Sequence, residues 1–214
     1  MKVLIDDRIQ EYAPEEIARW MDELPEWRRE RVLAIRHDAG RRQSLMAYRL
    51  LCQGVREAYG ITEQPTFVYG KHGKPYIKSQ NEAAPHFSLS HCREAVACII
   101  DSRPCGIDIE ATGRKVSDSL IRYAMNDDEI NLINRPLPSE GKLEGWGGNT
   151  LPQKEEPEGG HPFLRLWTRK EAVLKLLGTG IRDTMKEVLV DCPYHLETRE
   201  TERWVMSIAT SPSK

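Results

Sequence analysis

Hydrophobic residues recur at two spacings along this chain, and they predict a mixture of helices and short strands. Between residues 41 and 59 they repeat every three or four positions, as in a helix with one buried face, and Gly60 would end that helix. Helices are also predicted over residues 14–24, 117–125, 127–134 and 167–177. Alternating or continuous apolar runs predict strands over residues 1–5, 66–69, 86–90, 95–100, 106–110, 187–191 and 203–209.

The order of these elements is similar in the two halves of the chain, although no sequence repeat is present. Residues 135–162 interrupt the second half. They are rich in Pro, Gly and Glu and lack periodicity, which predicts a long mobile loop.

Composition narrows the class of protein. The chain has 214 residues, of which 39% are hydrophobic and 30% charged, and a formal net charge of -2. These values favour a packed core and argue against a nucleic-acid-binding protein, which usually carries a basic excess. The charged first ten residues argue against a signal peptide, and no run approaches the ~18 apolar residues of a membrane span. Five cysteines without C-x-x-C spacing predict reduced thiols in a cytoplasmic protein.

The segment from Gly106 to Glu110 carries two acidic side chains on one face of a predicted strand. Alternation places Ile107 and Ile109 on one side, and Asp108 and Glu110 on the other. Neighbouring carboxylates repel each other unless a cation lies between them, and hard divalent cations prefer oxygen ligands. A solvent-exposed strand face would carry the same pattern, so both interpretations stay open.

The predicted helix at 167–177 contains Glu171 and Lys175, four positions apart. One helix face would therefore present a carboxylate and an ammonium group, which could reach a metal and a phosphate together. Two structural roles fit the same spacing. Glu171 lies at capping-box distance from Thr168, and an exposed Glu171–Lys175 ion pair would contribute about 0.2–0.5 kcal/mol.

Several other polar residues are candidate phosphate ligands. Ser90 and His91 stand at the end of a predicted strand, Lys74 lies in a Gly-Lys-Pro turn, and Arg42 belongs to a group of arginines. A Ser-His pair for acyl transfer is disfavoured, because adjacent strand residues point to opposite faces. Lysines in turns and runs of charge are commonly solvated surface, so a functional role for Lys74 and Arg42 needs further support.

Four of these segments, in this order, resemble the motifs of one enzyme family. Gly-Ile-Asp-Ile-Glu at 106–110 and Trp-Thr-Arg-Lys-Glu-Ala-x-x-Lys at 167–175 resemble the two signature motifs of the 4′-phosphopantetheinyl transferase superfamily. Gly-Lys-Pro at 73–75 and Phe-Ser-Leu-Ser-His at 87–91 are similar to two further motifs of its monomeric, surfactin-synthetase-activating branch.

The resemblance implies an α/β (α+β) fold of two similar halves, residues 1–104 and 105–214, related by pseudo-twofold symmetry with the active site between them. It implies transfer of the 4′-phosphopantetheine group from coenzyme A to a serine of an acyl or peptidyl carrier protein, by a cytoplasmic monomer. Asp108, Glu110 and Glu171 would hold Mg²⁺. Glu171 and Lys175 would be catalytic, with Lys175 meeting the pyrophosphate of coenzyme A. The implied coenzyme A pocket also contains Arg42, Lys74, Ser90 and His91.

Two other functions would use parts of the same residue set. A metal-dependent phosphodiesterase needs the same carboxylates, although the net charge of -2 and the lack of an aromatic-basic strip argue against a nuclease. A non-catalytic coenzyme A-binding module would not need an intact set of metal ligands. Carrier-dependent release of adenosine 3′,5′-bisphosphate would distinguish the transferase from both.

Overall fold

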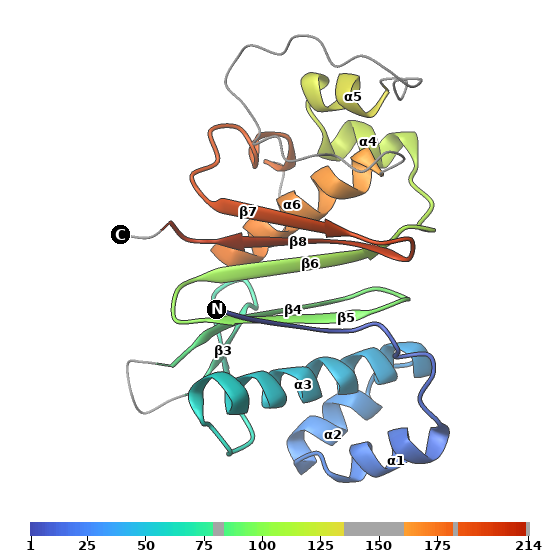
Figure 1. Cartoon of the computed structure of the whole chain (residues 1–214), viewed down its shortest axis with the longest axis vertical. Coiled ribbons are helices and arrows are strands. Elements are labelled where there is room, and N and C mark those ends of the chain that lie inside the picture. Colours follow the sequence, from blue (N-terminus) through green and yellow to red (C-terminus); the bar gives the residue numbers. More distant parts are fainter. Residues whose placement is uncertain (79–83, 135–160, 182–183, 213–214) are drawn as a thin grey trace.

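Two three-stranded antiparallel sheets form the centre of the molecule in a computed structural model, which describes residues 1–78, 84–134, 161–181 and 184–212. A long helix covers the outer face of each sheet, so helices lie at both ends of the molecule and the sheets between them (Figure 1). The loop predicted at 135–162 lies almost entirely outside the described residues. None of the described helices has the length and apolar character needed to cross a membrane.

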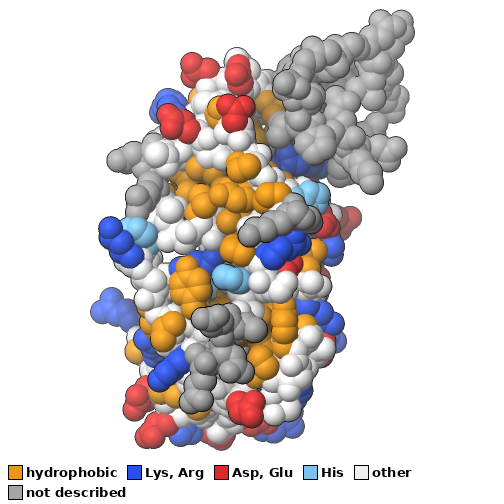
Figure 2. Space-filling view, turned by 90° about the vertical axis from the view of Figure 1, so that its left-hand side faces the viewer, with side chains coloured by type: hydrophobic (Ala, Val, Ile, Leu, Met, Phe, Trp, Pro, Cys, Tyr) orange, Lys and Arg blue, Asp and Glu red, His pale blue; other side chains and the backbone are white. Residues whose placement is uncertain are grey.

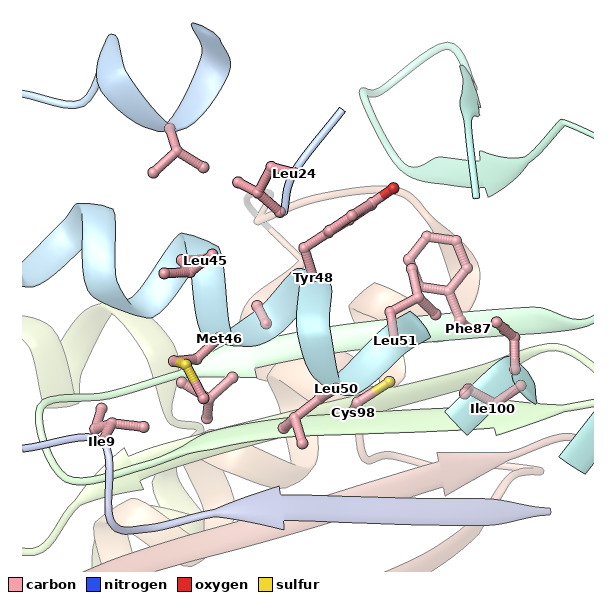
Figure 3. Close-up of a cluster of buried hydrophobic side chains, with 14 residues drawn as sticks. Ile9, Leu24, Leu45, Met46, Tyr48, Leu50, Leu51, Phe87, Cys98 and Ile100 are labelled. Atoms are coloured by element: carbon pink, nitrogen blue, oxygen red, sulfur yellow. The ribbon is translucent and has the colours of Figure 1, made fainter. Parts of the chain in front are cut away.

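The first sheet has the strand order β1-β5-β4, with β1 at Lys2–Asp6, β5 at Val96–Asp101 and β4 at His86–His91. Helix α3, Asp38–Tyr59, packs on it, and α1, Pro14–Asp22, and α2, Glu26–Leu33, pack beside α3. In Figure 3 Met46 and Leu50 of α3 point toward the strands, with Leu50 beside Cys98 of β5, whereas Leu45 and Tyr48 lie on the opposite side of the helix, toward Leu24. The small hairpin of β2, Phe67–Tyr69, and β3, Pro75–Ile77, precedes β4.

The second sheet has the order β6-β8-β7, with β6 at Cys105–Ala111, β8 at Trp204–Thr210 and β7 at His195–Glu200. Helix α6, Pro162–Leu177, covers it, while α4, Asp118–Ala124, and α5, Asp127–Ile133, lie beyond α6 at the end of the molecule. In both sheets the last strand of the half lies in the centre and its first strand lies at an edge. The α/β class is thus confirmed, while the pseudo-twofold symmetry and the domain boundary at residue 104 stay predictions.

The two sheets meet along their edge strands β4 and β6. The Ser88 hydroxyl accepts a hydrogen bond from the backbone N–H of Ile107 at 3.2 Å, and the Ser90 hydroxyl accepts one from Ile109 at 3.3 Å. We call this pair of contacts the serine seam. A buried apolar layer lies between the sheets, formed by Ala97, Ile99, Ile107, Ile109, Met206 and Ile208 among others.

Some large apolar side chains stay exposed. Val68, Tyr69 and Tyr76 lie on the β2–β3 hairpin, and Leu177 and Ile181 lie at and beyond the end of α6. On one face of the molecule, Lys, Arg and His side chains lie between two groups of hydrophobic side chains (Figure 2).

Two predictions about local structure are wrong, and three elements were not predicted: helix α2 and strands β3 and β7. Residues 187–191 form no strand, because a 3₁₀ turn, η1 at Met185–Glu187, and further turns occupy this segment. Strand β7 was not expected, since its polar sequence HLETRE is that of a half-exposed edge strand. Helix α6 begins at Pro162 rather than at residue 167, because proline fits the first turn of a helix.

The early start of α6 excludes a capping box between Thr168 and Glu171, because Thr168 lies inside the helix and is fully buried. Its hydroxyl instead donates to the Arg165 carbonyl at 3.2 Å and lies 2.8 Å from the Ser207 hydroxyl.

Candidate active site

A cleft of about 320 Å³ opens where β4, β6 and α6 meet. Strand β4 contributes Leu89, Ser90 and His91, strand β6 contributes Asp108 to Glu110, and α6 contributes Trp167, Glu171 and Lys175; Arg114 and Ile181 complete the lining. The two sheets therefore both contribute to it, as expected for a site between the halves.

Gly106 allows α6 to approach β6 closely enough to form this cleft. A Cβ atom on Gly106 would lie 1.9 Å from the Ala172 carbonyl oxygen and 2.6 Å from the Leu176 nitrogen, closer than atoms can pack. Gly106 and Asp108 share one face of β6 by alternation. The missing side chain at 106 therefore brings the helix that carries Glu171 and Lys175 against the strand that carries Asp108.

Asp108, Lys175 and Ser90 form a compact cluster in the cleft. The Lys175 ammonium donates to Asp108 Oδ1 at 2.7 Å and to the Ser90 hydroxyl at 2.8 Å. Ser90 in turn donates to the same Oδ1 at 2.8 Å. Lys175 thus pairs with Asp108, and the alternative surface ion pair between Glu171 and Lys175 is not among the ion pairs of the described residues.

Glu110 lies next to this cluster and has its own donors. The Trp167 indole Nε1–H donates to Glu110 Oε1 at 3.1 Å, and the Arg114 guanidinium forms an ion pair with the same oxygen. Burial and the negative charge of Asp108 raise the pKa of Glu110, while the charge of Arg114 lowers it. Trp167 and the cationic Arg114 therefore compensate only in part for placing Glu110 beside another acid.

Glu171 is the least compensated acid of the group. Its side chain is buried, and its Oε1 atom has no hydrogen-bond partner within the described structure. Burial, followed by the negative charge of Asp108, raises the pKa of Glu171 to about 7, although Lys175 counteracts this rise. A carboxyl group with a pKa near neutrality can accept and release a proton at physiological pH.

The donor atoms suit a hard cation, although the described side chains are not arranged around one. Asp108 Oδ2 and Glu171 Oε1 are both buried and without a hydrogen-bond partner among the described residues. Two such carboxylate oxygens beside Glu110 are the ligand type that magnesium prefers. Nevertheless, no group of three His, Cys, Asp or Glu residues in the described ranges has the geometry to hold a metal ion. In this structure Lys175 and Arg114 instead neutralise Asp108 and Glu110.

The candidate coenzyme A residues are not all in this cleft. Ser90 and His91 line it, but the Ser90 hydroxyl is already bonded to protein groups. The Lys74 ammonium donates to the Leu176 carbonyl at 2.8 Å, near the C-terminal end of α6. Arg42 donates to the backbone carbonyls of Ile9 and Tyr12, at 3.0 and 3.2 Å. Neither Lys74 nor Arg42 lines the cleft, and their roles in binding stay predictions.

Two residues of the site were not assigned a role from the sequence. Trp167 stands within the second signature motif, and its indole nitrogen is a hydrogen-bond donor that must find a partner when buried. Arg114 follows Glu110 by four positions, which is close enough to suggest contact. Neither signal distinguishes a bond to Glu110 from an ordinary core or surface position.

All five cysteines are free thiols, as expected. Cys92, Cys98 and Cys105 are buried. Burial raises the pKa of the Cys105 thiol to about 12, so it stays protonated and unreactive at neutral pH.

Comparison with known proteins finds similarity to one enzyme family. A model described as the 4′-phosphopantetheinyl transferase superfamily matches residues 104–204, which include β6, α6 and β7. A 4′-phosphopantetheinyl transferase of Bacillus subtilis is 27% identical over 165 residues, covering 76% of this chain and 64% of that protein. The transferase Sfp of Bacillus subtilis strain 168 is 26% identical over 170 residues, covering 79% and 66%. HetI of a Nostoc species is 34% identical over 122 residues, covering 55% and 44%. The chain thus spans just under two thirds of the length of these two Bacillus relatives.

Proposed function

We propose that the chain is a member of the 4′-phosphopantetheinyl transferase superfamily, and that it transfers the 4′-phosphopantetheine group of coenzyme A to a serine of an acyl or peptidyl carrier protein. The observation that carries this proposal is the cluster of two buried acids, Asp108 and Glu171, with the half-buried Glu110, beside Lys175. It lies in the cleft formed by the matched segment and β4. Phosphoryl transfer needs such a concentration of oxygen ligands and a positive charge near the reacting group.

In the proposed reaction the carrier serine attacks the phosphorus on the pantetheine side of the coenzyme A pyrophosphate. The new bond joins the serine oxygen to phosphorus, and the bond to the nucleotide phosphate breaks, which releases adenosine 3′,5′-bisphosphate. Glu171 is the candidate for accepting the serine proton, directly or through a water molecule, because its carboxylate lies in the cleft beside Lys175. Lys175 directs positive charge at the pyrophosphate, where negative charge increases during transfer.

Asp108, Glu110 and Glu171 would hold Mg²⁺ in this reaction. When bound, the ion would neutralise the pyrophosphate and its leaving group. The two buried carboxylate oxygens without partners, on Asp108 and Glu171, support this assignment.

The remaining proposed contacts belong to coenzyme A. Ser90, His91 and Lys74 would line the nucleotide and phosphate pocket, and Arg42 would lie on the 3′-phosphate side. Arg42 donates to its two backbone carbonyls through Nη1, so a contact with the 3′-phosphate would use the N–H groups of Nη2 or Nε. We further propose a cytoplasmic monomer, supported by the free thiols and by the resemblance to the monomeric branch.

The decisive experiment incubates the protein with coenzyme A, magnesium and a panel of purified apo-carriers, and follows the carriers by intact mass. We expect one phosphopantetheine adduct on at least one acyl or peptidyl carrier, together with adenosine 3′,5′-bisphosphate. Release of the bisphosphate without any carrier would favour a phosphodiesterase. Binding of coenzyme A without turnover on any carrier would favour a non-catalytic binding module.

A second experiment tests the nucleotide end of the site. If His91 and Arg42 contact the 3′-phosphate, calorimetry should show that the protein prefers coenzyme A to dephospho-coenzyme A by about tenfold or more, since charge-assisted contacts contribute about 1.5–3 kcal/mol each. Arg42→Ala should reduce this preference. Equal affinity of the wild-type protein for both ligands would refute the assignment.

A further inference from the structure

Arg114 lies at the junction of two clefts. It borders the cleft of about 320 Å³ described above and also a neighbouring cleft of about 430 Å³. Glu110 is the other residue that the two linings share. The neighbouring cleft is otherwise lined by the turn between β4 and β5, the end of β6 with the turn after it, and residues before β8: Cys92, Arg93, Glu94, Ala111, Thr112, Gly113, Glu202 and Arg203.

The guanidinium group of Arg114 makes two contacts inside the active-site cleft. It forms an ion pair with Glu110 Oε1, and it lies over the indole ring of Trp167, 4.9 Å from the ring centroid. Trp167 itself donates to the same Glu110 oxygen at 3.1 Å. One carboxylate oxygen thus accepts from both side chains, while the side chain of Arg114 keeps 30% of its surface exposed.

The ion pair between Arg114 and Glu110 affects how a cation can bind to the three acids. Three acids, Asp108, Glu110 and Glu171, face two cations, and each cation pairs with one acid: Lys175 with Asp108, and Arg114 with Glu110. A divalent cation that binds the acids must compete with these internal cations for the same oxygens. It is also repelled by any cation that stays nearby.

We propose that Arg114 is an internal counter-cation of the carboxylate cluster, which shields Glu110 and gives up this contact when a divalent cation binds. The inference rests on the proposed magnesium site. The adjoining cleft offers space for the displaced guanidinium. The turn that carries Arg114 is closed by a hydrogen bond from its own N–H to the Ala111 carbonyl at 3.0 Å, so the side chain can move while the backbone stays in place.

The test measures magnesium binding directly, by calorimetric titration of the full chain with magnesium chloride in the absence of coenzyme A. We expect Arg114→Gln to bind magnesium about tenfold more tightly than the wild-type protein, because one competing and repelling charge is gone. Arg114→Lys, which keeps the charge, should bind within about threefold of wild type.

Arg203 provides the matched control. It lines the neighbouring cleft, but its ion pair is with Asp7, at 2.9 Å, rather than with an acid of the cluster. Arg203→Gln removes the same unit of charge and should leave the magnesium affinity within about twofold of wild type. An equal gain in Arg203→Gln and Arg114→Gln would indicate a general field effect and overturn the proposal.

A second readout follows the contact itself. Tryptophan fluorescence should change during the magnesium titration, because the Trp167 ring loses the guanidinium that lies over it. The change should be absent in Trp167→Phe, and thermal unfolding verifies that each variant is folded.

The outcomes separate this proposal from the one on which it rests. If the wild-type protein and Arg114→Gln both fail to bind magnesium, the proposed metal site is wrong and the present inference falls with it. If wild type binds magnesium but Arg114→Gln binds it equally or more weakly, the metal site stands. Arg114 then does not compete with the ion, and the counter-cation role is refuted.

Discussion

Helices α3 and α6 occupy corresponding places on two sheets of the same connectivity, but they bury different chemistry. Apart from Tyr48, every residue that α3 buries is apolar or glycine. Helix α6 buries Thr168, Lys170 and Glu171 among its apolar residues. The helix on the first sheet thus serves as a scaffold, while its counterpart on the second sheet places ionisable groups in low-dielectric surroundings.

The two buried charges of α6 differ in turn from each other. Lys170 is fully buried and fully bonded: its ammonium donates to Glu129 Oε2 at 2.6 Å and to the carbonyls of Ala124 and Met185 at 2.8 and 2.7 Å. Glu171, the next residue, keeps an oxygen without a partner. A buried charge with all its bonds made holds the fold together, whereas an incompletely bonded one beside a cleft indicates a site for a ligand or a reaction.

The largest effect on stability is expected when the fully bonded ion pair between Lys170 and Glu129 is broken. Lys170→Met should lower the free energy of unfolding by about 3–5 kcal/mol, because Glu129 is left as a buried charge without its partner. Urea unfolding measures this value. Tyr48→Phe is the counterpart in α3, where only the hydrogen bond to the Pro65 carbonyl at 3.0 Å is lost, and it should cost about 1 kcal/mol.

The double variant Lys170→Met/Glu129→Leu should recover most of the loss, since no unpaired charge remains. A cost for Lys170→Met no greater than that of Tyr48→Phe would contradict a structural role for the pair.

The next largest effect is on the rate of carrier modification. Asp108→Asn removes a proposed anionic ligand of Mg²⁺ and the partner of Lys175, so carrier modification at saturating magnesium should fall by about 10²–10³-fold. Asp101, at the end of β5, is a buried acid of the first sheet, and Asp101→Asn should leave turnover of the folded protein near the wild-type value. Near-normal turnover of Asp108→Asn would show that the acids of the cleft are not the catalytic cluster.

Glu171 should also make stability depend on pH. Its pKa in the folded state, about 7, lies above the ordinary value of 4.5, so between these pH values the folded state binds more protons than the unfolded state. Stability from this group is therefore present at pH 4.5 and is lost as the pH rises to 7, by roughly 3 kcal/mol for the full shift.

Glu171→Gln removes the titrating group. The difference in unfolding free energy between the variant and wild type, measured with a chelator present, should therefore grow in favour of the variant over this range. A constant difference from pH 4.5 to pH 7.5 would mean that the carboxyl group of Glu171 is not perturbed by burial.

The smallest effect is on stability, and it compares Gly106, which lies against α6, with Gly54 of α3. Gly106→Ala should cost about 2 kcal/mol and displace α6, because the new methyl group meets backbone atoms at 1.9 Å that cannot rotate away. In the first half a Cβ on Gly54 would meet the Cδ1 atom of Ile100 at 2.3 Å. That atom is the end of a flexible side chain, so Gly54→Ala should cost less than about 1 kcal/mol.

Gly113→Ala, where nothing lies within 4 Å of a new Cβ, is the control in an open position. Chemical denaturation of the three variants measures the loss of unfolding free energy that each substitution causes. Equal costs for Gly106→Ala and Gly54→Ala would show that α6 moves on β6 more freely than its packing indicates.

Much of this site could be predicted from short motifs, because alternation along a strand and spacing along a helix place side chains on known faces. These local rules, together with the family resemblance, predict that Asp108 and Glu171 belong to one site. The pairing of Lys175 with Asp108 rather than with Glu171 could not be predicted, since it depends on how closely α6 approaches β6. That distance is set by Gly106, whose importance becomes visible only when the helix is in place.

In the fold, too, the features that depend on tertiary contacts could not be predicted from local sequence. Strong apolar periodicity located α3 well, with a start at residue 38 instead of 41. The β-branched residues around Val188 and Val190 predicted a strand, but Asp191 adopts a positive φ of 49° and the segment turns instead. The polar strand β7 exists because β8 offers it an edge to pair with, and no property of its own sequence predicts this partner.

The serine seam has a consequence for how assembly of the site can be observed. The amide protons of Ile107 and Ile109 bond to hydroxyl groups that come from the other sheet. Their protection against exchange with deuterated water therefore depends on the two sheets staying together, even while each sheet remains intact. Since Ser90 also bonds Asp108 and Lys175, separation of the sheets disrupts the cluster at the same moment. The exchange of these two amides thus reports the fraction of molecules with an assembled site, without any substrate being present.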